Sequence, residues 1–511
     1  MKRRDVLKAG AVAVASTPAI FGGAGVAKAQ LCRPEGIRSP NTEPDSPPVS
    51  SYTQPLYFPP AMTEVAAASL NPPPDPNRHQ RYNEFVPEKY YVQRLTEGFW
   101  NYHDELSALN PDGGSLAWMF NGATPGETMV ARYGEPVFVR RYNDLPALEN
   151  SRMPFGYPAS TMHLHNAHTA SESDGYPMDF TVPGEFWDHH YAMYLARRDP
   201  REALGSLWYH DHMIDFTSTN VYAGLSAMAI FYDGIDTGDE NDSNPDALRL
   251  PGNMQFGGDG NGNPNGYDIS LILHDVRFTE DGHPTYNVFD TDGHLGDLIT
   301  VNRKVKPFMN VEPRKYRFRI YDGGPSRLYE LELYDSDRNQ VGMTVISNDG
   351  NLLEAPVEAT SIVIGPANRH DVIIDFSSYS PGDHVDLENV MEQINGQGPT
   401  GRRLPEGQHM EVMRFKIVDL KGPDNSMVPS FLRALPDINL DEVVAEREWV
   451  FDHDMGLWTV NGEFMDPTII SAAPRQGTAE IWTFRNAGSS WAHPVHVHFE
   501  EFQVLEWNGK P

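Results

Sequence analysis

Short apolar runs alternate with turn-forming residues along most of the chain after residue 90. β-Branched and aromatic residues gather at residues 90–92, 129–131 and 137–139, and the dipeptides Asn121-Gly122 and Pro125-Gly126 lie between them. Short runs of this composition, separated at regular intervals by turn signals, are typical of β-strands and not of long helices. The pattern therefore predicts an all-β protein made of β-sandwiches.

The middle of the chain continues this pattern but includes two less regular segments. Residues 186–203 leave room for one short helix or an irregular excursion. Residues 256–262 are rich in Gly, Asp and Asn, which fits a calcium-binding loop or, better, a flexible interdomain loop. Buried or half-buried strands are predicted at residues 298–302, 316–320, 361–364 and 372–376.

The N-terminal residues have the features of an export signal. The pair Arg3-Arg4 precedes a run of small apolar residues, and Ala27-Lys28-Ala29 supplies a cleavage site. Paired arginines before a weakly hydrophobic run indicate the twin-arginine route, so we expect a periplasmic or secreted protein. A membrane anchor fits less well, because the run is rich in Gly and Ala and contains Pro18.

Composition and charge exclude several classes of protein. The chain has 511 residues, enough for several domains, and its formal net charge of −31 at pH 7 argues against binding to a nucleic-acid backbone. A single cysteine, Cys32, excludes an intramolecular disulfide. After the signal, no segment contains 18 unbroken apolar residues, so no membrane span is predicted in the mature protein.

Three His-x-His pairs are the main chemical signal in the sequence. They are His163-Leu-His165, His210-Asp-His212 and His496-Val-His498, and His493 precedes the last pair. Each pair lies in a segment that reads as a strand, the last one running on through residues 499–505. Alternate residues of a strand face the same side, so each pair places two imidazoles together. One such pair is weak evidence because surface histidines are common, whereas three pairs predict a metal centre.

The ligand type narrows the choice of metal. Imidazole-rich sites without thiolate or carboxylate ligands suit copper, zinc, iron or nickel. A structural zinc site needs only four ligands. Seven clustered imidazoles exceed that number and imply more than one ion, and a multinuclear imidazole site with open positions suits copper that binds dioxygen.

From about residue 90 onwards, the chain resembles the three-domain multicopper oxidases, and within them the bacterial laccase and bilirubin oxidase branch. The likeness includes the histidine segments and residues 120–128, 132–135, 143–146 and 364–372. The resemblance implies three consecutive cupredoxin-like Greek-key β-sandwiches, the third truncated. The expected organisation is a signal peptide at residues 1–29, a Pro-rich extended arm at 30–89, and cupredoxin domains at 90–244, 245–425 and 426–511.

The resemblance also implies copper as the cofactor and assigns its ligands. Six histidines would hold the type 2 and binuclear type 3 coppers: His163 and His496 the type 2 ion, and His165, His210, His212 and His498 the type 3 pair. His493 would bind type 1 copper. Asp174 resembles the acidic residue that helps to deliver protons to bound dioxygen, with an ordinary surface-loop aspartate as the alternative.

The sequence departs from the family's pattern at its C-terminal end. The family's last motif, His-Cys-His followed by another His and an axial Met or Leu, is absent, so the type 1 site would be incomplete. We expect an incomplete copy of a full oxidase, or a protein completed by a second chain, in preference to a degenerate member that has lost turnover. The turn predicted at residues 507–511 fits an interrupted hairpin.

The expected function is copper-dependent oxidation of a phenolic, pigment or metal-ion substrate, coupled to the four-electron reduction of dioxygen to water. Dioxygen and a small reducing substrate are therefore the expected partners. Without the type 1 cysteine, the family's usual electron route from substrate to the other coppers would be broken. The alternative is a non-enzymatic periplasmic protein of the same fold that binds copper or serves as a scaffold.

Overall fold

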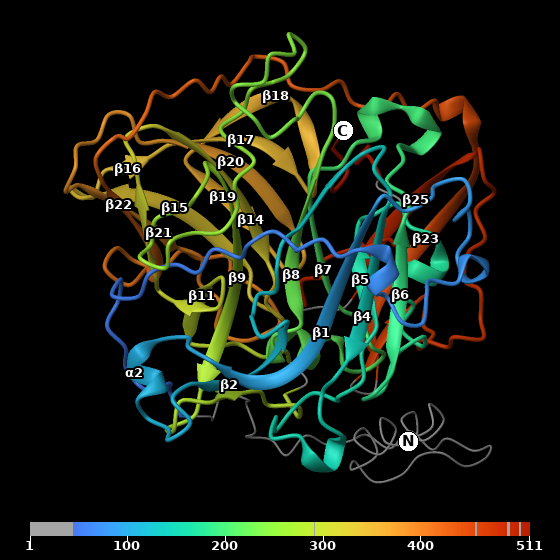
Figure 1. The fold of residues 1–511 in the computed structure, drawn as a ribbon, viewed down its shortest axis with the longest axis horizontal. Coiled ribbons are helices and arrows are strands. Elements are labelled where there is room, and N and C mark those ends of the chain that lie inside the picture. The colour runs from blue at the N-terminus through green and yellow to red at the C-terminus, as the bar shows by residue number, and fades with distance from the viewer. Residues whose placement is uncertain (1–43, 291, 455–456, 488–490, 500–501, 511) are drawn as a thin grey trace.

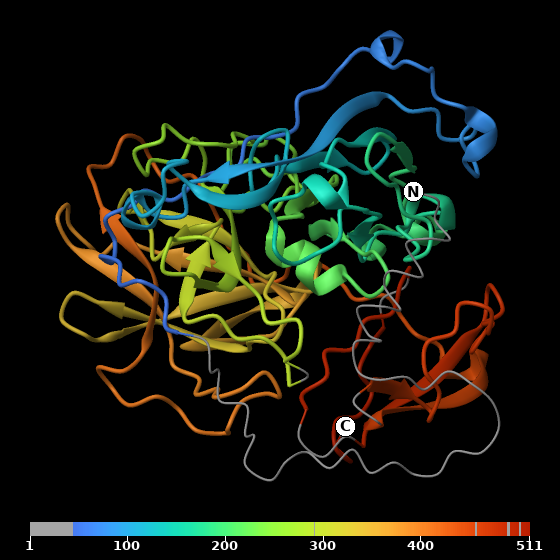
Figure 2. The same cartoon turned by 90° about the horizontal axis from the view of Figure 1, so that it is seen from below.

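The computed structural model describes residues 44–290, 292–454, 457–487, 491–499 and 502–510. The chain folds into two β-sandwiches followed by a smaller three-stranded sheet (Figure 1), and Figure 2 shows these three parts side by side. Strands dominate and helices are short, so the predicted all-β fold is confirmed. The predicted signal peptide and Cys32 lie outside the described residues.

The first sandwich pairs two four-stranded sheets, with the strand orders β2-β1-β4-β6 and β3-β8-β7-β5. Both sheets contribute to one apolar core, in which Trp118, Leu164 and Tyr209 are fully buried. Its strands are β1 (Lys89–Trp100), β2 (Ser115–Phe120), β3 (Met129–Arg132), β4 (Val137–Asn143), β5 (Met162–His165), β6 (Phe186–Tyr191), β7 (Ser206–Asp211) and β8 (Ser226–Tyr232).

The described helices are short and lie mainly in the connections of the first sandwich. The α-helices are α2 (Asp104–Ser107) and α3 (Thr217–Ala223). The 3₁₀ helices are η1 (Ala67–Ser69), η2 (Pro76–Arg78), η3 (Leu148–Asn150), η4 (Ser171–Ser173), η5 (Ala196–Arg198), η6 (Pro200–Glu202) and η7 (Leu440–Glu442). Among the described residues, no helix is long and apolar enough to span a bilayer.

The segment at residues 186–203 differs in part from the predicted short helix or irregular excursion. Its first six residues form β6, which pairs with β4 along its whole length, and 3₁₀ turns η5 and η6 follow. Pairing with a strand more than forty positions earlier decides this conformation, and such a partner leaves no signal in the local sequence.

The second sandwich packs an eight-stranded sheet against a six-stranded sheet. The larger sheet has the order β12-β11-β9-β14-β20-β17-β18 with β10 beside β9, and the smaller has β13-β22-β21-β15-β16 with β19 beside β15. Phe318, Leu331 and Phe415 are fully buried in the core between them. All four strands predicted in this region are present, as β11, β14, β19 and β20.

The larger sheet consists of β9 (Asp268–Phe278), β10 (Pro284–Thr285), β11 (Leu298–Val301), β12 (Lys304–Val305), β14 (Lys315–Asp322), β17 (Met343–Asn348), β18 (Asn351–Ala359) and β20 (Arg369–Asp375). The smaller sheet consists of β13 (Phe308–Val311), β15 (Tyr329–Asp335), β16 (Gln340–Val341), β19 (Ser361–Ile364), β21 (His384–Asn389) and β22 (Met410–Ile417). In the loop at residues 256–262, the Asp259 carboxylate accepts hydrogen bonds from Asn261 and Asn263, which ties the loop to itself.

Buried polar contacts fix the second sandwich to the first. Arg319 Nε donates to Asp268 Oδ1 at 2.8 Å, and Arg319 Nη1 donates to Ser206 Oγ at 2.7 Å. The Ser206 hydroxyl in turn donates to Asp371 Oδ1 at 2.6 Å. Ser206 is the first residue of β7, so these contacts hold the strand that carries His210 in a fixed position on the second sandwich.

Residues 44–88 form an extended arm that contacts both sandwiches. Leu56 is buried in the second core and Met62 in the first. Along the arm, Leu56 N donates to Phe308 O at 2.8 Å and Met62 N donates to Thr128 O at 2.9 Å. The arm therefore adds backbone and apolar contacts across the line where the two sandwiches meet.

The third part of the fold is a sheet with the order β24-β23-β25. Its strands are β23 (Val443–Asp454), β24 (Leu457–Val460) and β25 (Ala479–Asn486). Several large apolar side chains in this region are exposed, namely Val444, Leu457, Trp458, Val460, Phe464, Met465 and Ile470. Within the described part of the chain, no second sheet covers this one.

The last histidine segment is not a β-strand, so that prediction is wrong. Residues 491–499 and 502–510 contain no strand, and their one isolated bridge joins Trp507 to Lys510. A strand needs a neighbour that satisfies its backbone groups, and no described strand lies beside residues 491–499. Single contacts hold the segment instead, such as Ala492 N donating to Gln397 O at 2.7 Å.

Candidate metal centre

Two neighbouring strands of the first sandwich carry four of the predicted histidines. β5 and β7 pair antiparallel, with His163 directly opposite His210. His165 lies two residues further along β5, and His212 follows the end of β7, where its backbone N–H donates to Thr161 O at 2.8 Å. Because every second residue faces the same side, the four imidazoles gather on one face of this strand pair.

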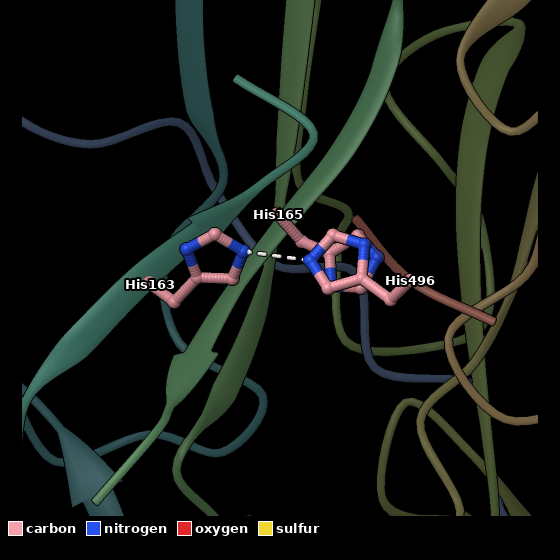
Figure 3. Close-up of side chains that lie close together, drawn as sticks. All are labelled: His163, His165 and His496. Atoms are coloured by element: carbon pink, nitrogen blue, oxygen red, sulfur yellow. Dashed lines mark hydrogen bonds between the residues drawn. The ribbon is translucent and has the colours of Figure 1, made fainter. Parts of the chain in front are cut away.

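The C-terminal tail brings two further imidazoles to the same face. Nε2 of His496 lies 3.2 Å from Nε2 of His163, and its ring stacks on that of His165 with centroids 3.7 Å apart (Figure 3). Nε2 of His498 lies 3.1 Å from Nε2 of His212. We refer to the six residues together as the histidine cluster: His163, His165, His210, His212, His496 and His498.

Backbone and carboxylate oxygens hold the outer ring nitrogens of the cluster. Nδ1 of His163 donates to the Asp174 carbonyl at 2.5 Å, and Nδ1 of His498 donates to Asp174 Oδ2 at 3.0 Å. Nδ1 of His210 donates to the Asp211 carbonyl at 2.7 Å. Bonds of this kind fix the tautomer and the ring orientation of histidines that bind metals. The proton of each of these three rings therefore points outwards.

The inner ring nitrogens fit a bound metal. Since His163, His210 and His498 carry their protons on Nδ1, their Nε2 atoms present lone pairs to the centre of the cluster. Each faces another imidazole nitrogen at 3.1–3.3 Å, the third such contact being His165 Nδ1 to His210 Nε2. Two nitrogens on one ion, each about 2.0–2.1 Å from it, lie about 2.9–3.4 Å apart at ordinary coordination angles. The observed spacing therefore matches pairs of ligands that share an ion.

Burial favours the neutral form of five cluster histidines, and neutral imidazole is the form that binds metal. Removal from water is the main cause of the lowered pKa values of His163, His165 and His210, and the charges of neighbouring imidazoles lower several of them further. The same causes lower the pKa of His212 to about 3 and that of His496 to about 2.

Asp174 is a buried part of this centre and not an ordinary surface-loop residue. Its side chain is 13% exposed, and Oδ1 lies 3.4 Å from His163 Nδ1. Burial by itself would raise the pKa of this carboxyl, but the hydrogen bonds from His163 and His498 outweigh that effect and hold the pKa below its ordinary value. Asp174 is therefore ionised and links one histidine of the first sandwich to one of the tail.

Arg369 of the second sandwich supports the cluster from behind. Its Nη2 donates to Asn166 Oδ1 at 2.7 Å, and its Nε donates to Ser206 O at 3.1 Å. Asn166 follows His165 directly, and Ser206 begins β7, so one fully buried guanidinium fixes both histidine strands. Its charge also contributes to the lowered pKa values of His165 and His496.

His493 lies outside the histidine cluster. Its ring packs on Trp458 and Phe451 of the third sheet, with centroid distances of 4.7 and 5.5 Å. Its Nε2 is buried without a hydrogen-bond partner, and burial lowers its pKa. An imidazole with a free nitrogen is suited to binding a metal.

The structure thus brings together six of the seven predicted ligands, together with Asp174. Sequence reasoning did not assign a role to Arg369 or to Trp208, whose ring lies 4.2 Å from that of His210 and forms one wall of the cluster. Arg369 is 203 residues from Asn166 in the chain, so no local pattern could reveal the contact. Trp208 lies two residues before His210, and the alternation of β7 could have indicated that it faces the same side.

Comparisons with known proteins agree with this geometry. A family described as "Multicopper oxidase" matches residues 105–234, and a second multicopper oxidase family matches residues 440–511. The chain is 33% identical over 421 residues to bilirubin oxidase of Albifimbria verrucaria, which covers 80% of the chain and 65% of that protein. It is 30% identical over 454 residues to a laccase of Bacillus stratosphericus, with 82% of the chain and 80% of the laccase covered.

Solved structures show the same fold. The laccase of Pediococcus acidilactici superposes with a TM-score of 0.63 at 23% identity, and the match covers 86% of this chain and 77% of that one. The multicopper oxidase McoA of Aquifex aeolicus gives a TM-score of 0.62 at 25% identity, covering 82% and 84% of the two chains.

Replacing Arg369 should loosen the centre. Arg369→Met removes the bonds to Asn166 and Ser206, so the histidine strands lose a shared support, and we expect metal affinity to fall by about 10–100-fold, as for other groups that orient ligands. Copper content after dialysis against a competing chelator measures the effect. The exposed Arg402 serves as the control, and Arg402→Met should retain the wild-type copper content. Equal retention in both variants would contradict the proposed support.

The metal-free protein should lose stability on mild acidification. The folded-state pKa values of five cluster histidines (His163, His165, His210, His212 and His496) lie below 6.5, so below that pH the unfolded chain binds protons that the folded chain does not. Stability is therefore retained above pH 6.5 and falls as the pH drops towards the folded values, by about 1.4 kcal/mol per pH unit for each such histidine.

Urea unfolding of the metal-free protein between pH 7 and pH 5 measures this slope. His212→Gln should flatten it by the contribution of one histidine, whereas His384→Gln, in the second sandwich, should leave it as in the wild type. If both variants keep the wild-type dependence of stability on pH, the lowered pKa of His212 does not contribute to the loss of stability in acid.

Proposed function

Because the chain belongs to the multicopper oxidase family, we propose that it couples one-electron oxidation of a small reducing substrate to the four-electron reduction of dioxygen to water. The observation that carries the proposal is the convergence of six imidazoles from residues 163–212 and 496–498, with their free nitrogens facing one another. The similarity to laccases and to a bilirubin oxidase favours an oxidase over a non-enzymatic copper-binding protein.

Copper is the family's cofactor, and the histidine cluster would hold it as one type 2 and two type 3 ions. Bound there, copper would supply one-electron redox chemistry and open positions for dioxygen. The chain's own contribution is a rigid set of ligands. β5 and β7 position four of the rings, and Arg369 forms hydrogen bonds at the ends of both strands. His496 and His498 of the tail complete the set. Trp208 covers one side of the rings and limits the access of water.

Asp174 is the residue best placed to manage protons. Its backbone carbonyl accepts from His163 Nδ1, its Oδ2 accepts from His498 Nδ1, and Oδ1 lies 3.4 Å from His163 Nδ1. An ionised carboxylate beside the cluster can bind a water molecule and orient it for proton transfer towards reduced oxygen. We assign it this role in addition to orienting two imidazoles.

The route by which substrate electrons enter involves His493. Its free Nε2 beside Trp458 and Phe451 supports a role as a type 1 copper ligand. The described residues contain no cysteine, so the thiolate of such a site would come from another segment or from a second chain. Phenols, pigments and oxidisable metal ions are the proposed substrate classes.

An oxygen-electrode assay with a substituted phenol tests the proposed function, using the copper-loaded protein together with a segment that supplies the type 1 cysteine. We expect four equivalents of phenol oxidised for each dioxygen consumed. Asp174→Asn should lower kcat by about 10²-fold or more, as for loss of a general acid or base, while the copper content stays close to that of the wild type. Asp179→Asn, in the same loop, is the control. The proposed oxidase function would be ruled out if the copper-loaded wild-type protein consumed no dioxygen in the presence of the cysteine-containing segment.

We also propose that the protein is exported in folded form, on the basis of Arg3-Arg4 and the Ala27-Lys28-Ala29 site. Replacing both arginines with lysine should leave the protein in the cytoplasmic fraction of a host that has the twin-arginine route. Unchanged export of the double variant, compared with the unaltered signal, would contradict this proposal.

A further inference from the structure

Three buried oxygens near the end of β14 have no hydrogen-bond partner. They are Asp275 Oδ1, Asp322 Oδ2 and the hydroxyl of Tyr329. Asp275 and Tyr329 are 0% exposed and Asp322 is 1% exposed. Buried polar atoms are nearly always paired in folded proteins, so three unpaired oxygens in one place indicate a group that binds them.

The three side chains converge beside Gly324, whose N–H donates to the other oxygen of Asp322, Oδ1, at 2.9 Å. A Cβ atom added at Gly324 would lie 3.1 Å from Asp322 Oδ1, 3.2 Å from Asp275 Oδ1 and 3.9 Å from the Tyr329 hydroxyl. A side chain at this position would crowd the two carboxylates, so glycine lets oxygen atoms from β9, β14 and β15 approach one another closely.

The charges in this space do not balance. Arg327 donates to Asp275 Oδ2 at 2.9 Å and to the carbonyl of Gly296 at 2.7 Å, so one guanidinium faces two carboxylates. Burial and the charge of Asp275 both raise the pKa of Asp322. With both carboxyls ionised, one negative charge would be left over in a water-poor interior, where an isolated ion is costly.

A shared proton does not resolve this imbalance. A proton on Asp322 would remove the charge, but one O–H can supply at most one of the other two unpaired oxygens with a partner. A neutral water would bond to the oxygens but would leave the charge. A cation in the space between them satisfies both the bonds and the charge.

We propose that Asp275, Asp322 and Tyr329 form a binding site for a single hard cation, separate from the histidine cluster. A donor set made only of oxygen suits Na⁺, Mg²⁺ or Ca²⁺ and not copper. The site lies at a structurally important position: the backbone of Asp322 bonds with Ala367 and Asn368, in the loop that leads to Arg369. A cation there stabilises the end of β14 and the loop that supports the metal centre.

The copper-loaded protein, dialysed into choline chloride at constant ionic strength, provides the test. Addition of NaCl, MgCl₂ or CaCl₂ in separate samples should show one cation that raises the thermal unfolding midpoint by about 5 °C, with saturation. Elemental analysis after removal of free salt should find one equivalent of that ion per chain if it is divalent. For Na⁺, the midpoint titration alone identifies the ion.

Two variants and a control assign the effect to this site. Asp322→Asn should abolish the response, and Tyr329→Phe, which removes a single oxygen and keeps the shape, should shift the titration at least 10-fold towards higher cation concentration. Asp386→Asn removes another carboxylate of the same sandwich, paired with Arg414, and should keep the wild-type response. The proposal is overturned if no cation raises the wild-type midpoint, or if Asp322→Asn and Tyr329→Phe both respond as the wild type does. Either result would assign the space to a water beside a protonated Asp322.

Discussion

Three pairs of imidazole nitrogens lie 3.1–3.3 Å apart in the histidine cluster, and each pair needs either a proton or a metal ion between its two atoms. This constraint explains much of the surrounding structure. Removal from water lowers the pKa values of His163, His165, His210, His212 and His496, which favours their neutral form. The outer protons of three rings in the cluster are directed to Asp174 and to the Asp211 carbonyl, which turns the free nitrogens inwards. The Asp174 and Asp211 contacts and Arg369 hold this arrangement in place.

The rest of the fold supplies the rigidity that this arrangement needs. The second sandwich carries no member of the cluster, yet it positions the cluster through Arg369 and through the Arg319–Ser206–Asp371 contacts at the start of β7. The arm adds backbone pairing on both sandwiches. The second sandwich is therefore more than a linker. Its buried charged side chains form hydrogen bonds at the ends of both histidine strands of the first sandwich. The third sheet has fewer such ties and exposes much of its apolar surface.

Local chemistry determines which features could be predicted from the sequence. The pairs at His163 and His210 were visible because strand alternation has a period of two, and they do lie on paired strands. The strand predicted around His496 is not present, because a strand depends on a neighbour that the sequence does not specify. β6 was not predicted as a strand, because β4, the strand with which it pairs, lies more than forty positions earlier in the chain. The role of Asp174 came only from resemblance to a family, and its contacts with His163 and His498 became visible only in three dimensions. Arg369, Asp275 and Asp322 act across long sequence separations, so no spacing rule could find them.

The most direct test of the account is to locate copper in crystals of the copper-loaded protein by anomalous scattering at the copper edge. The account predicts peaks inside the histidine cluster, about 2.0–2.1 Å from Nε2 of His163 and His496 and from the facing nitrogens of the other two pairs. Copper found only at surface carboxylates, with the cluster nitrogens still in contact with one another, would contradict it.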